Sequence, residues 1–231
     1  MSVQEQFAKV RETLPVPFAQ THPFEIPART AAPVNGARIA KRLLDLLIAL
    51  PLLAVIAPLL IAVAVLVKLD SSGPAFFRQK RLGLNGKPFR ICKFRTMHVV
   101  EDGAAVAQAT PGDARVTRIG AFLRTASIDE LPQLLNVIAG DMSLVGPRPH
   151  AIAHDRYYTA LIPEYEQRQN VKPGITGWAQ VNGYRGGTPT LDLMQRRVEF
   201  DLWYADHASL PLDLLILIRT PIALVRNRSV Y

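Results

Sequence analysis

The stretch LLIALPLLAVIAPLLIAVAVLV, residues 46–67, contains no charged side chain. A helix that crosses a bilayer needs about 20 apolar residues, so this stretch is long enough to enter a membrane. It is not a cleaved secretion signal, because such signals begin near the N-terminus behind a short basic region. Here residues 1–45 come first, and they include Glu5, Glu12 and Glu25. The stretch therefore predicts a membrane-inserted helix, which we place at residues 37–69.

Two prolines and the flanking charges argue against a simple span. Pro51 and Pro58 each remove a backbone donor and disfavour helical geometry in the preceding residue. Both flanks are basic, and basic flanks prefer the cytoplasm. The cations are Arg38, Lys41 and Arg42 before the stretch and Lys68, Arg78, Lys80 and Arg81 after it. A helix broken at Pro58 would enter one leaflet and return to the same face, while an ordinary kinked span and a buried core helix stay open as alternatives.

The overall composition limits the classes of partner. The 231 residues carry a formal net charge of +8 and one cysteine, which excludes a disulfide framework and an acidic disordered chain. The basic charge is concentrated in residues 71–100, which contain seven Lys or Arg and no acid. Phosphate-bearing ligands and anionic membrane suit this charge. We expect no nucleic-acid partner, because no known nucleic-acid-binding module is visible.

The rest of the chain predicts an α+β fold that is mostly helical. We divide the whole chain into an irregular N-terminal tail at residues 1–36, the membrane helix at 37–69 and a cytosolic domain with interfacial helices at 70–231. Within that domain, turn residues 83–86 lie between two short apolar runs and predict a β-hairpin. Apolar spacing predicts helices at residues 127–139, 150–170 (interrupted near Pro163) and 190–206. Residues 210–225 are apolar but interrupted by charge, which favours an interfacial helix.

The adjacent carboxylates Asp129 and Glu130 have two interpretations. Ser127 and Glu130 match the S-x-x-E capping box, in which acids stabilise the first turn of a helix. The same position also suits catalysis, because neighbouring carboxylates can share a Mg²⁺ that binds phosphate. An ionised aspartate can moreover attack phosphorus. The pattern alone favours the cap and leaves the catalytic hypothesis open.

Two glycine- and proline-rich runs are too long for plain turns. They are GDMSLVGPRP at residues 140–149 and KPGITGWAQVNG at residues 172–183. Such runs bring backbone N–H groups close to a ligand or fix rigid turns. Arg148 lies between two prolines, which suits the recognition of phosphate. His150 and His154 have the spacing of a metal site on a helix, but no third ligand is evident.

Four of these motifs, found together in one order, resemble the bacterial sugar transferase family. They are KFRTM (93–97), SIDELPQ (127–133) and the two runs above. The family consists of monotopic polyprenyl-phosphate hexose-1-phosphate transferases, and the resemblance extends from about Arg38 to Tyr231. Further motifs look most like the glucose-specific, undecaprenyl-phosphate branch of exopolysaccharide pathways. These are QAT (108–110), PHAIAH (149–154), GYRGGTPTL (183–191) and RVEFDL (197–202).

The resemblance implies a two-step reaction. Asp129 would attack a UDP-sugar and release UMP, and undecaprenyl phosphate would then accept the sugar phosphate. Asp129 and Glu130 would hold Mg²⁺ as the cofactor. By position in the motifs, the implied phosphate-binding residues are Lys93, Arg95, Arg124, Arg148 and, as a weaker polar candidate, Asp201. The family breaks its membrane helix at a Ser-Pro pair, which here is Ala57-Pro58.

The implied partners are a UDP-sugar, undecaprenyl phosphate and membrane lipid. The implied location is the bacterial inner membrane, with the catalytic domain on its cytoplasmic face. Larger relatives place spanning helices in front of the shared region, so we expect the compact catalytic form. Glucose is the expected sugar, and galactose is the alternative. A non-catalytic, membrane-anchored basic scaffold is the alternative of another class, and the sequence leaves the oligomeric state, a homo-oligomer included, open.

Overall fold

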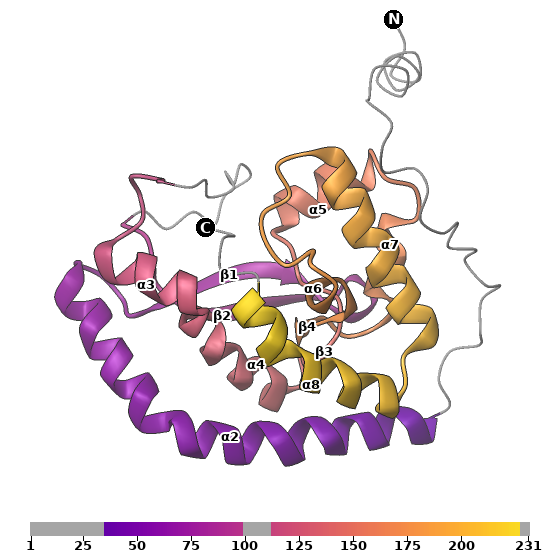
Figure 1. The fold of residues 1–231 in the computed structure, drawn as a ribbon, viewed down its shortest axis with the longest axis horizontal. Coiled ribbons are helices and arrows are strands. Elements are labelled where there is room, and N and C mark those ends of the chain that lie inside the picture. Colours follow the sequence, from indigo (N-terminus) through magenta and orange to yellow (C-terminus); the bar gives the residue numbers. More distant parts are fainter. Residues whose placement is uncertain (1–34, 99–111, 227–231) are drawn as a thin grey trace, which may run out of the picture.

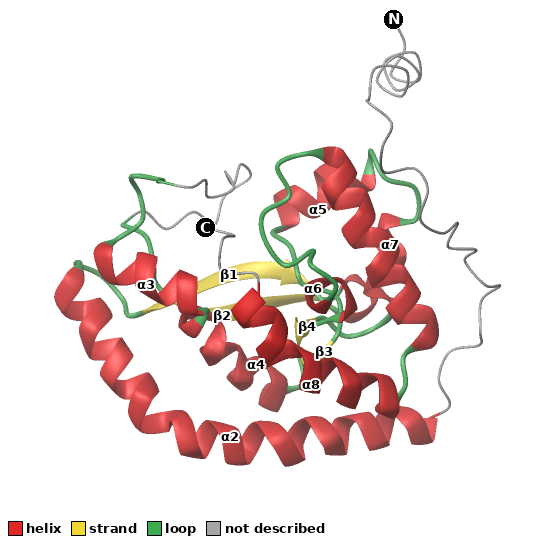
Figure 2. Ribbon diagram, viewed as in Figure 1, coloured by secondary structure: helices red, strands yellow, loops and turns green. Residues whose placement is uncertain are grey.

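The computed structural model describes residues 35–98 and 112–226, which form a mostly helical domain (Figures 1 and 2). Nearly all of the expected tail lies outside these residues, as does the QAT motif at 108–110. The described helices are α2 (Asn35–Asp70), α3 (Arg118–Ala126), α4 (Leu134–Ala139), α5 (Ile152–Thr159), α6 (Trp178–Val181), α7 (Leu191–His207) and α8 (Leu210–Arg226). The described strands are β1 (Phe76–Leu82), β2 (Pro88–Phe94), β3 (Ser143–Val145) and β4 (Gly174–Thr176).

The apolar stretch lies in α2, which runs along the base of the domain and then turns up one side of it (Figure 1). By length and composition the helix is long and apolar enough to cross a membrane. Only 11% of an apolar 18-residue segment of α2 is buried inside the protein, so the alternative of a buried core helix is wrong. Large apolar side chains such as Leu47, Val55 and Ile61 are mostly exposed on its outer surface.

At Ala57-Pro58, where a break is predicted, the backbone of α2 stays helical, as it does at Pro51. A proline inside a helix removes one backbone hydrogen bond and commonly kinks the axis, but the helix can continue beyond it. Figure 1 shows that the axis of α2 changes direction while the helix continues without an interruption. The bounds of the membrane helix, predicted as 37–69, are close to those observed.

The predicted hairpin is confirmed. Strands β1 and β2 pair antiparallel, with Phe76 opposite Phe94 and Leu82 opposite Pro88. The connecting 3₁₀ turn, η1 (Leu84–Gly86), contains Asn85 in the left-handed region, which asparagine tolerates well. Phe89 and Ile91 of β2 are buried in the main core. The hairpin thereby presents its alternate side chains, Lys93 among them, to the neighbouring segments.

The helix predicted at residues 127–139 is two elements. Residues Ile128–Gln133 form a 3₁₀ helix, η2, and α4 follows it directly. Pro132 lies inside η2 and cannot donate a backbone hydrogen bond, which favours a short and irregular first segment. Strand β2 packs on η2, so the hairpin and the acidic pair are brought together.

The two glycine-rich runs form a small parallel pair. Ser143 of β3 lies opposite Gly174 of β4, and Val145 lies opposite Thr176. A Cβ on Gly146 would lie 2.2 Å from the carbonyl oxygen of Lys172, so only glycine permits this approach. The runs therefore pack backbone against backbone and fix the loop that carries Arg148.

The other predicted helices are largely confirmed. The 150–170 segment forms α5 and the 3₁₀ helix η3 (Tyr165–Asn170), with the interruption near Pro163 as expected. Thr190 caps α7 by accepting from the N–H of Leu193. Helix α8 lies beside α2 in Figure 1 and buries Ile216 in the core while Ile218 and Ile222 stay exposed.

Candidate active site

The acidic pair lies in η2, directly after a backbone reversal at Ser127. Ser127 has φ 58° and ψ 22°, and its N–H donates to the Arg124 carbonyl at the end of α3. The predicted capping box is wrong, because the Ser127 side chain caps no N–H of η2 and the Glu130 carboxylate points to other partners. The Ser127 hydroxyl instead accepts a hydrogen bond from Arg185, 58 residues further along the chain.

Glu130 is held by two cations. Arg148 donates through both terminal nitrogens, Nη1 to Oε2 at 2.8 Å and Nη2 to Oε1 at 2.5 Å. The Lys93 ammonium donates to Oε1 at 2.8 Å. Burial by itself would raise the pKa of Glu130, but the charges of Arg148 and Lys93 outweigh it and hold that pKa well below its usual value. Glu130 is therefore a carboxylate at any pH near neutrality.

Asp129 is buried beside this cluster but is bonded differently. Within residues 35–98 and 112–226, it accepts no hydrogen bond. Burial, and next the charge of Glu130, raise the pKa of Asp129 to about 6, against the opposing charges of Lys93, Arg124 and Arg148. Two neighbouring carboxylates with separated pKa values have different chemical roles available to them. Asp129 is the one whose oxygens are free to bond to a substrate.

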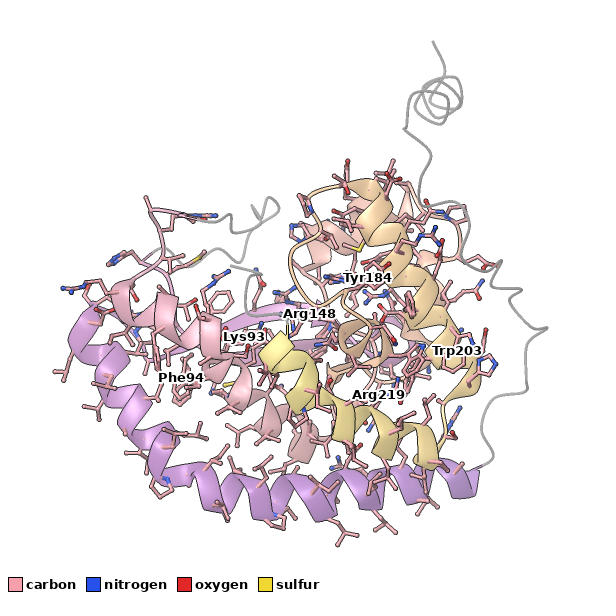
Figure 3. The ribbon with its side chains drawn as sticks, in the orientation of Figure 1. Lys93, Phe94, Arg148, Tyr184, Trp203 and Arg219 are labelled. Atoms are coloured by element: carbon pink, nitrogen blue, oxygen red, sulfur yellow. The ribbon has the colours of Figure 1, made fainter. Side chains whose placement is uncertain are left out.

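The cations come from three separate segments. Lys93 comes from β2, Arg124 from the last turn of α3 and Arg148 from the loop after β3. Figure 3 shows Lys93 and Arg148 beside each other in the middle of the domain, which agrees with their shared partner Glu130. Such a convergence of cations around a carboxylate in a partly buried place is suited to binding phosphate groups.

Arg95 does not join this group. Its guanidinium is buried and donates to the carbonyls of Val67 at 3.3 Å, Ser71 at 2.6 Å and Ser72. These carbonyls lie at the C-terminal end of α2, where backbone oxygens lack intrahelical donors and a cation is favoured. The structure thus places Arg95 as a cap of α2, and not among the cations around Asp129.

Asp201 also lies away from the carboxylate pair. It is buried on α7 and accepts from Arg168 at 2.6 Å. Arg168 donates in turn to the backbone carbonyl of Arg148 at 2.6 Å. Asp201 therefore acts on the site through Arg168, which fixes the backbone of a phosphate-binding candidate.

Sequence reasoning missed Arg168 and Arg185. Arg168 lies in the segment predicted as part of a helix, and nothing in its spacing distinguishes it from a surface cation. Arg185 lies in the GYRGG loop, whose glycines were the only available signal. Both reach the site through tertiary contacts that no local pattern encodes.

The two-histidine metal hypothesis is not supported by the described residues. His150 is buried, and its Nδ1 lies 2.6 Å from the Tyr165 hydroxyl and 3.0 Å from Arg168. Burial and the surrounding arginines hold the pKa of His150 well below its usual value. Residues 35–98 and 112–226 contain no group of three or more His, Cys, Asp or Glu arranged to hold a metal ion.

The comparison with known families matches this arrangement of motifs. A model described as "Bacterial sugar transferase" matches residues 36–227. The chain belongs to the bacterial sugar transferase family. The match takes in α2, the hairpin, the acidic pair and both glycine-rich runs, so the elements that build the site all lie within the family region.

Three relatives of this sugar transferase carry informative names. A UDP-glucose:undecaprenyl-phosphate glucose-1-phosphate transferase of Caulobacter vibrioides is 58% identical over 193 residues, covering 84% of this chain and 72% of the relative. A protein of the same name from Escherichia coli is 50% identical over 200 residues, covering 86% of this chain and 43% of the relative. The exopolysaccharide production protein PSS of Rhizobium leguminosarum is 46% identical over 189 residues, covering 80% of this chain and 94% of the relative.

The raised pKa of Asp129 predicts a stabilising effect of Asp129→Asn. Because the folded-state pKa of about 6 exceeds the usual 3.8, ionisation of Asp129 opposes folding, and this cost is complete only above about pH 6. The amide removes that cost, so the variant is expected to gain up to about 3 kcal/mol at pH 8. Thermal unfolding in detergent at pH 8 and pH 4 measures the effect. The gain in stability should vanish at pH 4. If the variant and the unmodified protein unfold at the same temperature at pH 8, the pKa of Asp129 is not raised.

Proposed function

We propose that this bacterial sugar transferase moves glucose-1-phosphate from UDP-glucose to undecaprenyl phosphate. The products are UMP and the diphosphate-linked lipid sugar, which begins the assembly of an exopolysaccharide repeat unit. The observation that carries the proposal is Asp129, a buried carboxylate that accepts no hydrogen bond from the described residues and lies beside three cations. The names of the Caulobacter and Escherichia coli relatives support this substrate pair.

The first step forms a bond from the Asp129 carboxylate to the β-phosphorus of the donor. The bond from that phosphorus to the bridging oxygen breaks, and UMP leaves with the electron pair. In the second step, an oxygen of the acceptor phosphate attacks the same phosphorus, and the bond to Asp129 breaks. The carboxylate is thereby restored, and no proton has to be removed from it in either step.

The cations around Asp129 stabilise charge on the phosphate oxygens throughout. Arg148 and Lys93 are fixed by Glu130, so their positive charge is already placed before a substrate arrives. Arg124 contributes further charge from the end of α3. Glu130 thus acts by positioning these cations, while Asp129 supplies the nucleophile.

The carboxylate pair also suits Mg²⁺. This ion is usually bound through one or two carboxylates together with substrate phosphates, so no larger cluster of acids is needed. Asp129 and Glu130 are the residues that would hold it. When bound, the ion would neutralise charge on the diphosphate.

We further propose that α2 is re-entrant in the cytoplasmic membrane and that the domain lies on the cytoplasmic face. Near its start, Lys41 bonds to Asp213 of α8 at 2.6 Å. Near its end, Val67 packs in one cluster with Leu123, and Asp70 accepts from the N–H of Ile119 at 3.2 Å. Both ends of α2 thus contact the same domain. A straight span would separate them by about 54 Å and place them on opposite sides of a bilayer core about 30 Å thick.

Replacing the nucleophile is expected to abolish transfer. Asp129→Asn should lower UMP release by about three orders of magnitude or more, because an amide cannot form the acyl phosphate. The measurement uses UDP-glucose with undecaprenyl phosphate, and UDP-galactose as the competing donor. Asp192→Asn, an exposed aspartate at the start of α7, is the matched control.

The covalent step has its own readout. Without the acceptor, intact mass spectrometry of the unmodified protein should show the addition of one hexose phosphate, which Asp129→Asn lacks. Near-normal turnover in that variant would remove Asp129 as the nucleophile.

Metal removal is expected to stop the reaction without unfolding the protein. Chelation with EDTA should abolish UMP release, and added Mg²⁺ should restore it, because the paired carboxylates and the diphosphate need a shared cation. The unfolding temperature should stay unchanged, since no described contact depends on the metal. Full activity in EDTA would contradict the cofactor proposal.

Cysteine labelling tests the topology of α2. The single cysteine, Cys92, is first replaced by alanine, and then Gly36→Cys, Val55→Cys or Ser72→Cys is introduced. All three positions are exposed in the structure. A membrane-impermeant maleimide should label positions 36 and 72 in inverted vesicles only, and position 55 from neither side. Labelling of positions 36 and 72 from opposite faces would establish a spanning helix instead.

A further inference from the structure

A second cluster of basic side chains lines a cavity of about 190 Å³ at the beginning of α2. It forms where α2 meets the segment after η3 and the corner between α7 and α8. Four cations line it, Arg38, Lys41, Arg42 and Lys172, together with apolar side chains such as Leu84 and Leu210. None of the cations around Asp129 lines this cavity, so it is separate from the candidate active site.

The two acids of the cavity are already engaged with the protein. Asp213 accepts from Lys41 at 2.6 Å and from the Tyr204 hydroxyl at 2.6 Å. Asp45 accepts from the Ser143 hydroxyl and from the N–H of Leu144, both at 2.9 Å. These acids balance only part of the positive charge, because four cations face two carboxylates.

Arg42 and Lys172 bring their charges together beside the end of α4. Arg42 donates to the carbonyls of Val137 at 2.5 Å and Ile138 at 2.7 Å, which carry no full negative charge. The Arg42 guanidinium and the Lys172 ammonium lie 3.6 and 3.8 Å from the point where Gly140 would carry a Cβ. Partial burial, and next the charge of Arg42, lower the pKa of Lys172 below its usual value.

The side chains of Arg38 and Lys172 form no hydrogen bond or ion pair with any residue in the described ranges. The two helices that border the cavity also expose apolar side chains that do not line it. Ile39 and Leu43 of α2 are 62% and 55% exposed, and Leu214 of α8 is 45% exposed. A cationic cavity that also contains apolar side chains, between helices with exposed apolar surfaces, matches an anion that is attached to hydrocarbon, and a water-soluble anion would not use those surfaces.

We propose that this cavity binds the phosphodiester headgroup of an anionic phospholipid. Arg38, Arg42 and Lys172 surround the phosphate, and the acyl chains lie along the exposed apolar side chains of α2 and α8. The lipid compensates the excess of positive charge where α2 enters the membrane. This site is independent of sugar transfer, and the proposed function does not depend on it.

Native mass spectrometry of the full chain in an uncharged detergent tests the site. The probe is dioleoyl phosphatidylglycerol, which is anionic. Dioleoyl phosphatidylcholine, which has no net charge, and inorganic phosphate, which is a water-soluble anion, are the comparison ligands. Arg38→Gln and Lys172→Gln should each weaken phosphatidylglycerol binding about fivefold, and the double variant about 25-fold. Lys68→Gln is the matched control, because Lys68 is an exposed lysine at the other end of α2 and lies outside the cavity.

Each result decides the proposal. A loss in Lys68→Gln equal to that in Lys172→Gln would show diffuse attraction to the basic surface and overturn the site. Equal binding of phosphatidylcholine, or saturation by inorganic phosphate at the same concentration, would overturn the assignment to an anionic lipid. Lys172→Arg should keep the affinity. If it loses as much as Lys172→Gln, charge at this position does not bind the lipid, and the proposal fails.

Thermal unfolding separates lipid binding from a folding defect. Lys172→Gln should unfold at an equal or higher temperature in phosphatidylcholine, because the charge of Lys172 is disfavoured in the lipid-free protein. The rise in unfolding temperature caused by phosphatidylglycerol should be smaller in the variant than in the unmodified protein. An unchanged rise would overturn the proposal.

Discussion

Lys41, near the start of α2, donates hydrogen bonds to three other elements. Its ammonium bonds to the Val145 carbonyl of β3 at 3.1 Å, to the Tyr204 hydroxyl of α7 at 3.2 Å and to Asp213 of α8 at 2.6 Å. A mostly buried charge pair is retained only where its remaining hydrogen-bonding groups are satisfied, and here the carbonyl and the hydroxyl provide this. Since the membrane helix cannot bury its outer face in protein, these polar bonds and the packing of its inner face hold the domain on it. The position of the domain relative to α2 follows from these contacts.

The candidate active site also depends on charged side chains that are fixed by their hydrogen-bonding partners. Glu130 satisfies Arg148 and Lys93, and Arg168 holds the Arg148 backbone while Asp201 holds Arg168. Each cation therefore has a fixed place before any phosphate arrives, which reduces the reorganisation that a reaction would require. The excess of hydrogen bonds at Glu130 contrasts with their absence at Asp129 among the described residues. Because Glu130 accepts the hydrogen bonds of Arg148 and Lys93, the oxygens of Asp129 stay free to react.

The sequence predicted those features that depend on local pattern. The uncharged stretch, the hairpin around residues 83–86 and the helix at residues 190–206 follow from the absence of charge, from turn residues and from apolar spacing. The acidic pair and Arg148 were also identified, from motifs and family resemblance. Features set by distant partners were not predictable in this way. Ser127 matches a capping box, yet it takes a left-handed conformation and bonds to Arg185.

Arg95 shows the same limit. It lies two residues from Lys93 in one motif, and a strand places both on the same face. However, the strand ends at Phe94, so Arg95 leaves that register and turns to the end of α2. A motif records that both residues matter to the family, but it does not record which of them faces a ligand. Only the positions of the α2 carbonyls decide this.

The cations around Asp129 and the cations of the cavity at the start of α2 differ in how much of their charge nearby carboxylates neutralise. This difference fits the ligands that we propose for the two sites. Around Asp129, two carboxylates face three cations, and one carboxylate bonds to two of those cations directly. That balance weakens the binding of phosphate, which suits a site that must release UMP and a lipid product, because a product that is bound too tightly leaves slowly. In the cavity at the start of α2, four cations face two acids that are already bonded, and nothing has to leave. The less balanced place is therefore suited to a resident anion, and the more balanced one to an anion that reacts.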